Sequence, residues 1–145
     1  MAEGISIGGR PAGGDGAAGA PAPWEGIPSE PGAPAIVDLT AYGEQLLVRA
    51  RADARGKASA PVLKSERQRA LLVALTAGAG LAEHASPPAA SLQVLSGRFR
   101  LHVPGTGDEW VCGVGDLVAI PPERHAVDCV EDGVFLLTVT PPSRD

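Results

Sequence analysis

The chain has 145 residues, which is enough for one domain with a packed core and too few for two domains of ordinary size. Its 12 basic and 17 acidic residues give a net charge of −5, and no basic stripe is visible, so we expect no nucleic-acid partner. No stretch reaches the roughly 18 unbroken apolar residues of a membrane span, and the N-terminus lacks the charged start and apolar centre of a signal peptide. These features predict a cytoplasmic protein that does not bind membranes.

The first 34 residues are rich in glycine, proline and alanine, which together occupy 22 of those positions. Glycine follows no three-residue period there, which excludes a collagen helix. Such a segment cannot bury enough apolar surface to offset the entropy lost on ordering. We therefore predict a disordered N-terminal tail over residues 1–34.

A helix is predicted over residues 38–55 because apolar residues recur there at steps of three and four, which gives one apolar stripe. The stripe consists of Leu39, Tyr42, Leu46, Leu47, Ala50 and Ala54. Asp38 or Thr40 can cap its start, and Gly56 stands where a left-handed residue often follows a helix. Residues 57–69 are polar and are predicted to form a loop that leads into the first strand.

From residue 70 onward the helical spacing gives way to short strand-like segments between glycine, proline and aspartate turn signals. The predicted strands cover 71–75, 91–95, 98–103, 109–112, 116–120, 126–130 and 134–139. Two of the predicted turns fall at residues 96–97 and 131–133. Short strands at intervals of about eight to twelve residues indicate an antiparallel sandwich or barrel.

The first half of this strand-rich region carries glycine and histidine at a characteristic spacing. Gly78 is followed by five residues and then His84. Ser86, Ala90 and Gly97 stand at the later positions of the same pattern.

A second pattern follows after a short interval. Gly115 is followed by five residues and Pro121, and His125 comes one residue earlier than the pattern places it. The two patterns resemble the two motifs of the cupin superfamily, and the resemblance covers about residues 70–140.

This resemblance implies an all-β fold, the double-stranded β-helix or cupin jelly-roll barrel. The expected organisation is a disordered tail at 1–34, a helix and linker at 35–69, and the barrel at 70–140. Cupins commonly pair through their sheets, so the resemblance also implies a homodimer.

The metal site of cupins holds a divalent ion with three imidazoles and one carboxylate, and only half of that set is present here. His84 and His125 match, whereas Ser86 and Ala90 stand where the second histidine and the glutamate belong. Serine is a poor transition-metal ligand and alanine is none. We expect these four residues to line a ligand-binding pocket. A weakly bound Zn, Fe, Mn or Ni ion on the two histidines is less favoured than no metal.

Cys129 is a possible third ligand, because His125, Val127 and Cys129 share one face of their predicted strand. Gln93 alternates to the face opposite Ala90 and is expected to point away. The simpler interpretation of Cys129, and of Cys112, is a buried free cysteine, with a regulatory disulfide as the least favoured alternative.

Three functions are open at this point. The first is a non-catalytic cupin that binds a small molecule in its barrel. The second is a divalent-metal-dependent enzyme, such as a dioxygenase or isomerase, with a reduced two-histidine site. The third is a structural role in which the tail at residues 1–34 recruits a partner. His102 lies on a polar, outward-facing stripe and is predicted to have no role in any of them.

Overall fold

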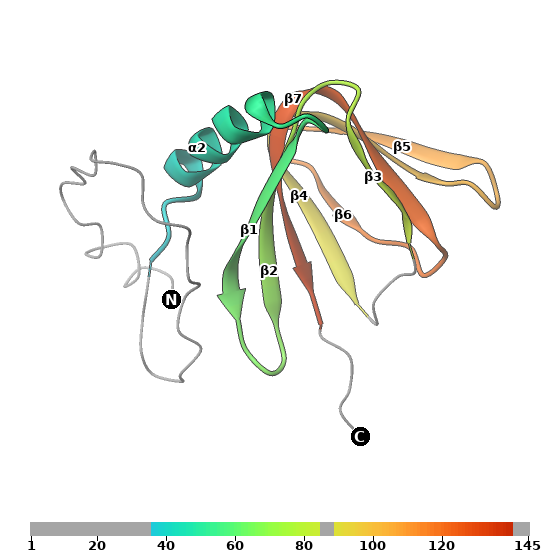
Figure 1. Ribbon diagram of the computed structural model, residues 1–145. Helices are drawn as coiled ribbons and strands as arrows, with labels where there is room; N and C mark the ends of the chain where they lie inside the picture. The colour runs from blue at the N-terminus through green and yellow to red at the C-terminus, as the bar shows by residue number, and fades with distance from the viewer. Residues whose placement is uncertain (1–35, 85–88, 141–145) are drawn as a thin grey trace.

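The computed structural model describes residues 36–84 and 89–140, which form a curled antiparallel sheet with one helix packed against it (Figure 1). The elements are α2 (Leu39–Ala52), β1 (Lys57–Lys64), β2 (Arg69–Leu75), β3 (Gly80–His84), β4 (Ala90–Val103), β5 (Asp108–Gly113), β6 (Leu117–Ala119) and β7 (His125–Val139). The tail predicted over residues 1–34 lies outside the described residues, so its disorder stays a prediction.

Two long strands, β4 and β7, run through both layers of the barrel. The first half of β4 and the second half of β7 belong to a helix-side sheet with the order β1-β2-β7-β4-β6. The remaining halves belong to a far sheet with the order β3-β7-β4-β5. Every pairing is antiparallel, and the predicted all-β jelly-roll class is confirmed.

The two long strands bend together at a glycine corner formed by Gly97 and Gly133. Gly97 has a φ of +78°, which side chains rarely adopt. A Cβ on Gly97 would lie 2.6 Å from the Cα of Gly133, and a Cβ on Gly133 would collide with the Ser96 carbonyl. The ladder between β4 and β7 also shifts register on both sides of Ser96. Bulges of this kind let a strand turn from one sheet into another without ending.

The turns predicted at residues 96–97 and 131–133 are therefore wrong, because β4 and β7 continue through both positions. Glycines between apolar segments indicate a sharp change in chain direction. They do not distinguish a turn that reverses the chain from a bend within a continuous strand. Gly97 does have the positive φ that the turn assignment required.

The loop predicted at 57–69 is also wrong over much of its length, since β1 occupies Lys57–Lys64. β1 is an edge strand, where the missing N–H of Pro61 is tolerated, and its ladder shifts register between Pro61 and Leu63. Only Ala60 and Val62 are fully buried, so the strand carries little of the apolar pattern that identifies strands in a sequence. The sequence prediction likewise missed β3.

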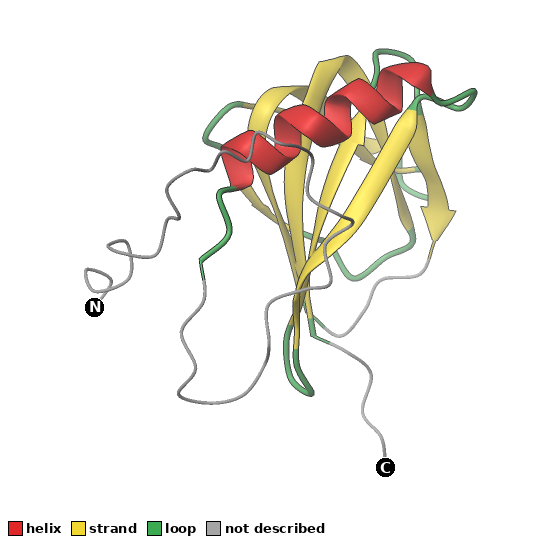
Figure 2. Ribbon diagram, turned by 60° about the vertical axis from the view of Figure 1, so that its left-hand side comes forward, coloured by secondary structure: helices red, strands yellow, loops and turns green. Residues whose placement is uncertain are grey.

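The helix is confirmed, with Asp38 as its cap: the Asp38 carboxylate accepts a hydrogen bond from the Ala41 N–H at 3.1 Å. It ends at Ala52, three residues earlier than predicted, with Asp53 rather than Gly56 at its C-terminal boundary. α2 lies across the outer face of the helix-side sheet (Figure 2). Leu46 and Ala50 are fully buried there. Gly43 fits closely over Val134, whose Cγ1 would be 3.2 Å from an added Cβ. No helix within the described residues is long and apolar enough to span a membrane.

The inside of the barrel is filled near the glycine corner by apolar side chains from both sheets. Phe99 and Phe135 meet edge to face, with ring centroids 4.9 Å apart and planes at 86°. Both rings are 1% exposed or less. We call the end of the barrel away from this corner the distal end: β3 ends there, and β4 and β7 begin there.

Candidate functional site at the distal end

His125 is the first residue of β7 and the only polar or charged side chain that is fully buried among the described residues, at 3% exposure. Its Nδ1 lies 2.9 Å from the carbonyl oxygen of Glu123. Because a carbonyl can only accept, Nδ1 carries the proton in this contact, and the lone pair of the neutral ring lies on Nε2. Nε2 is the nitrogen suited to accept a hydrogen bond or to ligate a metal.

The backbone of His84 is the direct partner of His125 in the β3–β7 ladder. One histidine from each motif therefore lies on neighbouring antiparallel strands, as the resemblance implied. The side chain of His84 and the whole of Ser86 lie outside the described part of the chain. Their predicted places in the pocket stay predictions.

Ala90 begins β4 at the distal end, opposite Val139 of β7. Alternation puts it on the face of Leu92 and Val94, both of which are buried inside the barrel. Gln93 therefore lies on the other face, as expected, and does not complete a ligand set. The position that carries a carboxylate in cupin metal sites thus holds a methyl group on the inner face.

Cys129 is buried inside the barrel, and its single S–H has two carbonyl acceptors within reach, Glu131 at 3.0 Å and Leu75 at 3.4 Å. Burial raises the pKa of the thiol to about 11, and the negative charge of Asp132 acts in the same direction. Cys129 is also four residues beyond His125, about 13 Å along an extended strand. The structure therefore does not bring this thiol to the histidine, and it keeps the sulfur protonated at neutral pH.

A disulfide between the two cysteines is geometrically unsuitable. Cys112 and Cys129 pair with Phe99 from opposite sides, on β5 and β7. Two inter-strand steps separate their Cα atoms by about 10 Å, and a disulfide needs less than about 7 Å. Both are free, buried cysteines, as the simpler interpretation predicted.

The donors at the distal end fit a tightly held transition metal poorly. Ala90 offers no ligand atom, Cys129 is neutral and distant, and His125 is one imidazole. Counting His84 as well gives two, whereas protein sites that hold zinc use three or four. Among the side chains that the structure describes, no three His, Cys, Asp or Glu residues are grouped closely enough to hold a cation.

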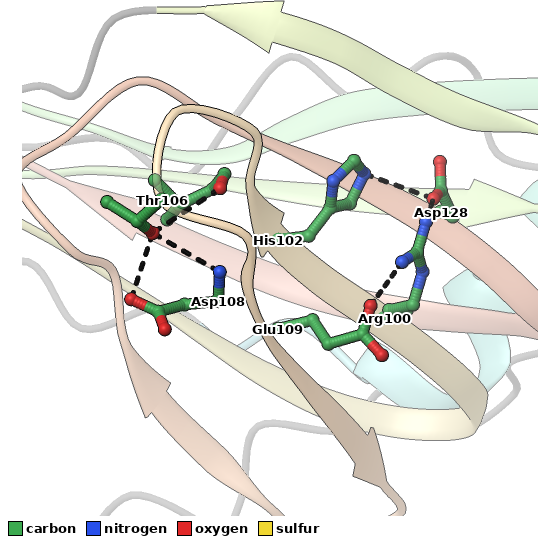
Figure 3. A network of polar contacts seen from close by, with 7 residues as sticks. Arg100, His102, Thr106, Asp108, Glu109 and Asp128 are labelled. Atoms are coloured by element: carbon green, nitrogen blue, oxygen red, sulfur yellow. Dashed lines mark hydrogen bonds and ion pairs between the residues drawn. The ribbon is translucent and has the colours of Figure 1, made fainter.

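A polar network occupies the outer face of the far sheet (Figure 3). The Arg100 guanidinium donates hydrogen bonds to the carboxylates of Glu109 and Asp128, the second at 2.7 Å, and these bonds raise the pKa of Arg100, the bond to Asp128 most. His102 Nε2 lies 3.1 Å from the same Asp128 oxygen. The outward position predicted for His102 is confirmed, but alternation alone did not identify its partner, which comes from a strand 26 positions later in the chain.

A second feature of the distal end was not predicted. A hollow of about 360 Å³ lies where the β1–β2 turn approaches the start of β4 and the end of β7. It is lined by Arg67, Gln68, Ala89, Ala90, Ser91, Thr138, Val139 and Thr140. Of the pocket residues expected from the sequence, only Ala90 is in this lining. The sequence indicated this hollow only weakly. Alternation places Ser91 and Thr138 on outer faces, but the register between β4 and β7, which brings the two residues side by side, is known only from the structure.

No protein-family model matches the chain, and no curated protein does. Several solved structures are similar to the chain. A conserved protein of unknown function from Streptococcus pyogenes, SPY1581, is 22% identical with a TM-score of 0.55, over 63% of this chain and 80% of its own. An RmlC-like cupin from Shewanella frigidimarina is 24% identical with a TM-score of 0.54, over 63% and 82%. KdgF from a Halomonas species is 18% identical with a TM-score of 0.53, over 63% and 84%.

The chain therefore has the RmlC-like cupin fold, and the resemblance seen in the sequence is confirmed at that level. Several of the similar structures are described only as cupins or as proteins of unknown function. At identities below 25% the likeness establishes the fold, and the function has to be argued from the site.

Proposed function

We propose that this cupin binds a small molecule at the distal end of its barrel and does not catalyse a reaction on it. The observation that carries the proposal is the burial of His125, whose polar ring lies among mostly apolar buried side chains in the part of the barrel that the structure describes. A buried polar side chain in a cavity-forming fold is a common mark of a ligand site.

The surroundings of His125 support this use. The Glu123 carbonyl accepts a hydrogen bond from Nδ1 and fixes the orientation of the ring, so the imidazole is a positioned polar group that a ligand can meet. Val127, two residues further on the same face, and Leu81, its partner in β3, supply apolar walls. Such walls suit the carbon skeleton of a ligand. The proposed contacts also include Ala90, and they include His84 and Ser86 by position in the sequence.

The alternative is a divalent-metal-dependent enzyme, a dioxygenase or isomerase with a reduced two-histidine site. The backbone pairing of His84 with His125 favours it. A bound metal would supply Lewis-acid or redox chemistry, and His125 would contribute Nε2 as a ligand. The alanine at position 90 and the neutral Cys129 thiol weigh against it.

Native mass spectrometry and elemental analysis of protein purified without chelators decide between the two. We expect a non-covalently bound organic molecule in the wild type, lost in His125→Ala, with Fe, Mn, Ni and Zn each far below one per chain. His102→Gln is the matched control, because it removes a histidine from the outer face, and it should retain the molecule.

Two outcomes would contradict the proposal. Stoichiometric metal that disappears in both His84→Ala and His125→Ala would support the enzyme. The absence of a bound molecule in the wild type would contradict the proposed ligand site. Retention of the bound molecule in His125→Ala would show that His125 is not part of the site.

A homodimer and a cytoplasmic location belong to the same proposal. Exposed apolar side chains on β5 and β6, Trp110 (45% exposed), Val111 (56%) and Leu117 (67%), support self-association. These strands are the edges of the two sheets, which is where a second copy can pair.

A further inference from the structure

The hollow beside the β1–β2 turn is a shallow depression, largely open to solvent. Its volume of about 360 Å³ is enough for a small ligand. Its lining combines one charged residue, Arg67, with hydroxyl-bearing residues and with the apolar residues Ala89, Ala90 and Val139.

Two hydroxyls lie together on one wall of the hollow. Ser91 and Thr138 are directly opposite each other in the β4–β7 ladder, so their Cβ atoms are about 5 Å apart. Both side chains are half-buried. Neither hydroxyl hydrogen-bonds to a residue that the structure describes, and the Arg67 guanidinium has no carboxylate partner there. Half-buried donors without partners are what a ligand would satisfy.

The charge around the hollow is positive in a chain that is negative overall. The β1–β2 hairpin carries Lys64, Arg67 and Arg69 against one carboxylate, Glu66, whereas the whole chain has a net charge of −5. The excess of positive charge at this tip attracts anions from solution.

The backbone that presents Arg67 is fixed by Ser65. The Ser65 hydroxyl accepts hydrogen bonds from the N–H groups of Arg67 at 3.3 Å and Gln68 at 3.0 Å. The Ser65 N–H donates to the Gln68 carbonyl at 2.9 Å, which closes the turn. Because the turn is ordered before a ligand arrives, less entropy is lost on binding.

We propose that this hollow binds a small organic anion through a phosphate or carboxylate group. The guanidinium of Arg67 pairs with the anionic oxygens, for which its planar fork of donors is suited. Ser91 and Thr138 donate hydrogen bonds to the remaining oxygens, and the alanines and Val139 contact the carbon skeleton. The hollow shares Ala90 with the proposed site at His125, but His125 itself does not line it, so a His125 variant tests the proposed function without removing a residue of the hollow.

Chemical-shift titration of the amide NMR spectrum with inorganic phosphate and, separately, with succinate tests the proposal. We expect saturable shifts at Ser91 and Thr138 with at least one of the two anions, and the stronger one identifies the preferred group. Arg67→Gln should weaken the apparent affinity about tenfold or more, and Thr138→Val severalfold. His125→Ala should leave it unchanged.

Arg69→Gln is the matched control. It removes the same charge two positions away, from a residue outside the lining, and should change the affinity less than about twofold. Equal weakening by Arg67→Gln and Arg69→Gln would show general attraction to a positive tip and would overturn the proposal. So would wild-type titrations in which neither anion shifts Ser91 or Thr138, a result that does not depend on any variant folding.

Discussion

At the scale of single residues, alternation along the strands predicted which way side chains point and did not predict what they touch. The inward position of Cys129 and the outward positions of Gln93 and His102 are as expected. The contact from His102 to Asp128 was not foreseen, nor were the carbonyl acceptors of the Cys129 thiol. Direction depends on the local two-residue period, whereas contacts depend on the register between distant strands.

The raised pKa of Cys129 leads to a prediction about stability at high pH. The folded-state pKa of about 11 lies above the reference value of 9.0, so the folded protein holds this proton more tightly than the unfolded chain. The stabilisation is fully present below pH 9 and is lost as the pH rises towards 11. Urea unfolding between pH 8 and 11 should therefore show a steeper decline for the wild type than for Cys129→Ala.

Parallel curves for the two proteins would show that burial does not hold the proton on the thiol, and the case against Cys129 as a ligand would then rest on its distance from His125 alone. Cys112, whose thiol pKa burial also raises, remains in both proteins and cancels from the comparison.

At the scale of the elements, the glycine corner explains both the success and the error of the strand prediction. The short strands predicted in the sequence coincide with the halves of β4 and β7. Their division at residues 96–97 and 131–133 is wrong, because the chain bends there by a bulge. β1 was missed because its residues resemble a loop, and its pairing with β2 stabilises it from outside its own sequence.

Substitution at the corner tests this explanation. Gly97→Val places a branched side chain at a φ of +78° and against the carbonyls of Glu131 and Asp132. Strain from the φ alone is on the order of 1–3 kcal/mol, and the overlap adds to it, so we expect a loss of about 3 kcal/mol or more in the free energy of unfolding.

Gly105→Val is the control for that experiment. An added Cβ at Gly105 meets nothing within 4 Å, and its φ is not positive. The change should stay within about 0.5 kcal/mol, as for surface substitutions generally. Similar losses in the two variants would mean that the corner does not depend on the missing side chain at Gly97.

At the scale of the whole molecule, the fold could be predicted from the spacing of glycines, prolines and histidines. The candidate site could be predicted only in part. The motifs indicated that His84 and His125 lie on neighbouring strands, and the structure pairs the two residues in the β3–β7 ladder, although β3 itself was not predicted. The hollow beside Arg67 was not predicted from the sequence, because its lining comes from the β1–β2 turn, the start of β4 and the end of β7. Only the folded sheet brings these segments together.

The distal end therefore has two chemically different parts. One is the buried imidazole of His125 in apolar surroundings, and the other is the cationic hollow at Arg67. The erosion of the metal-ligand set leaves His125 with a methyl group at position 90 in place of a carboxylate. This arrangement suits the binding of an organic molecule better than the binding of a metal ion.

The most direct test is the imidazole ¹⁵N NMR spectrum of the protein as purified, recorded before and after the bound molecule is stripped and then with one equivalent of Zn²⁺. We expect a His125 ring that carries a proton on Nδ1, a shift of its Nε2 resonance on stripping, and no stoichiometric change with Zn²⁺. Stoichiometric shifts of His84 and His125 together at one equivalent of Zn²⁺, with no effect of stripping, would contradict it.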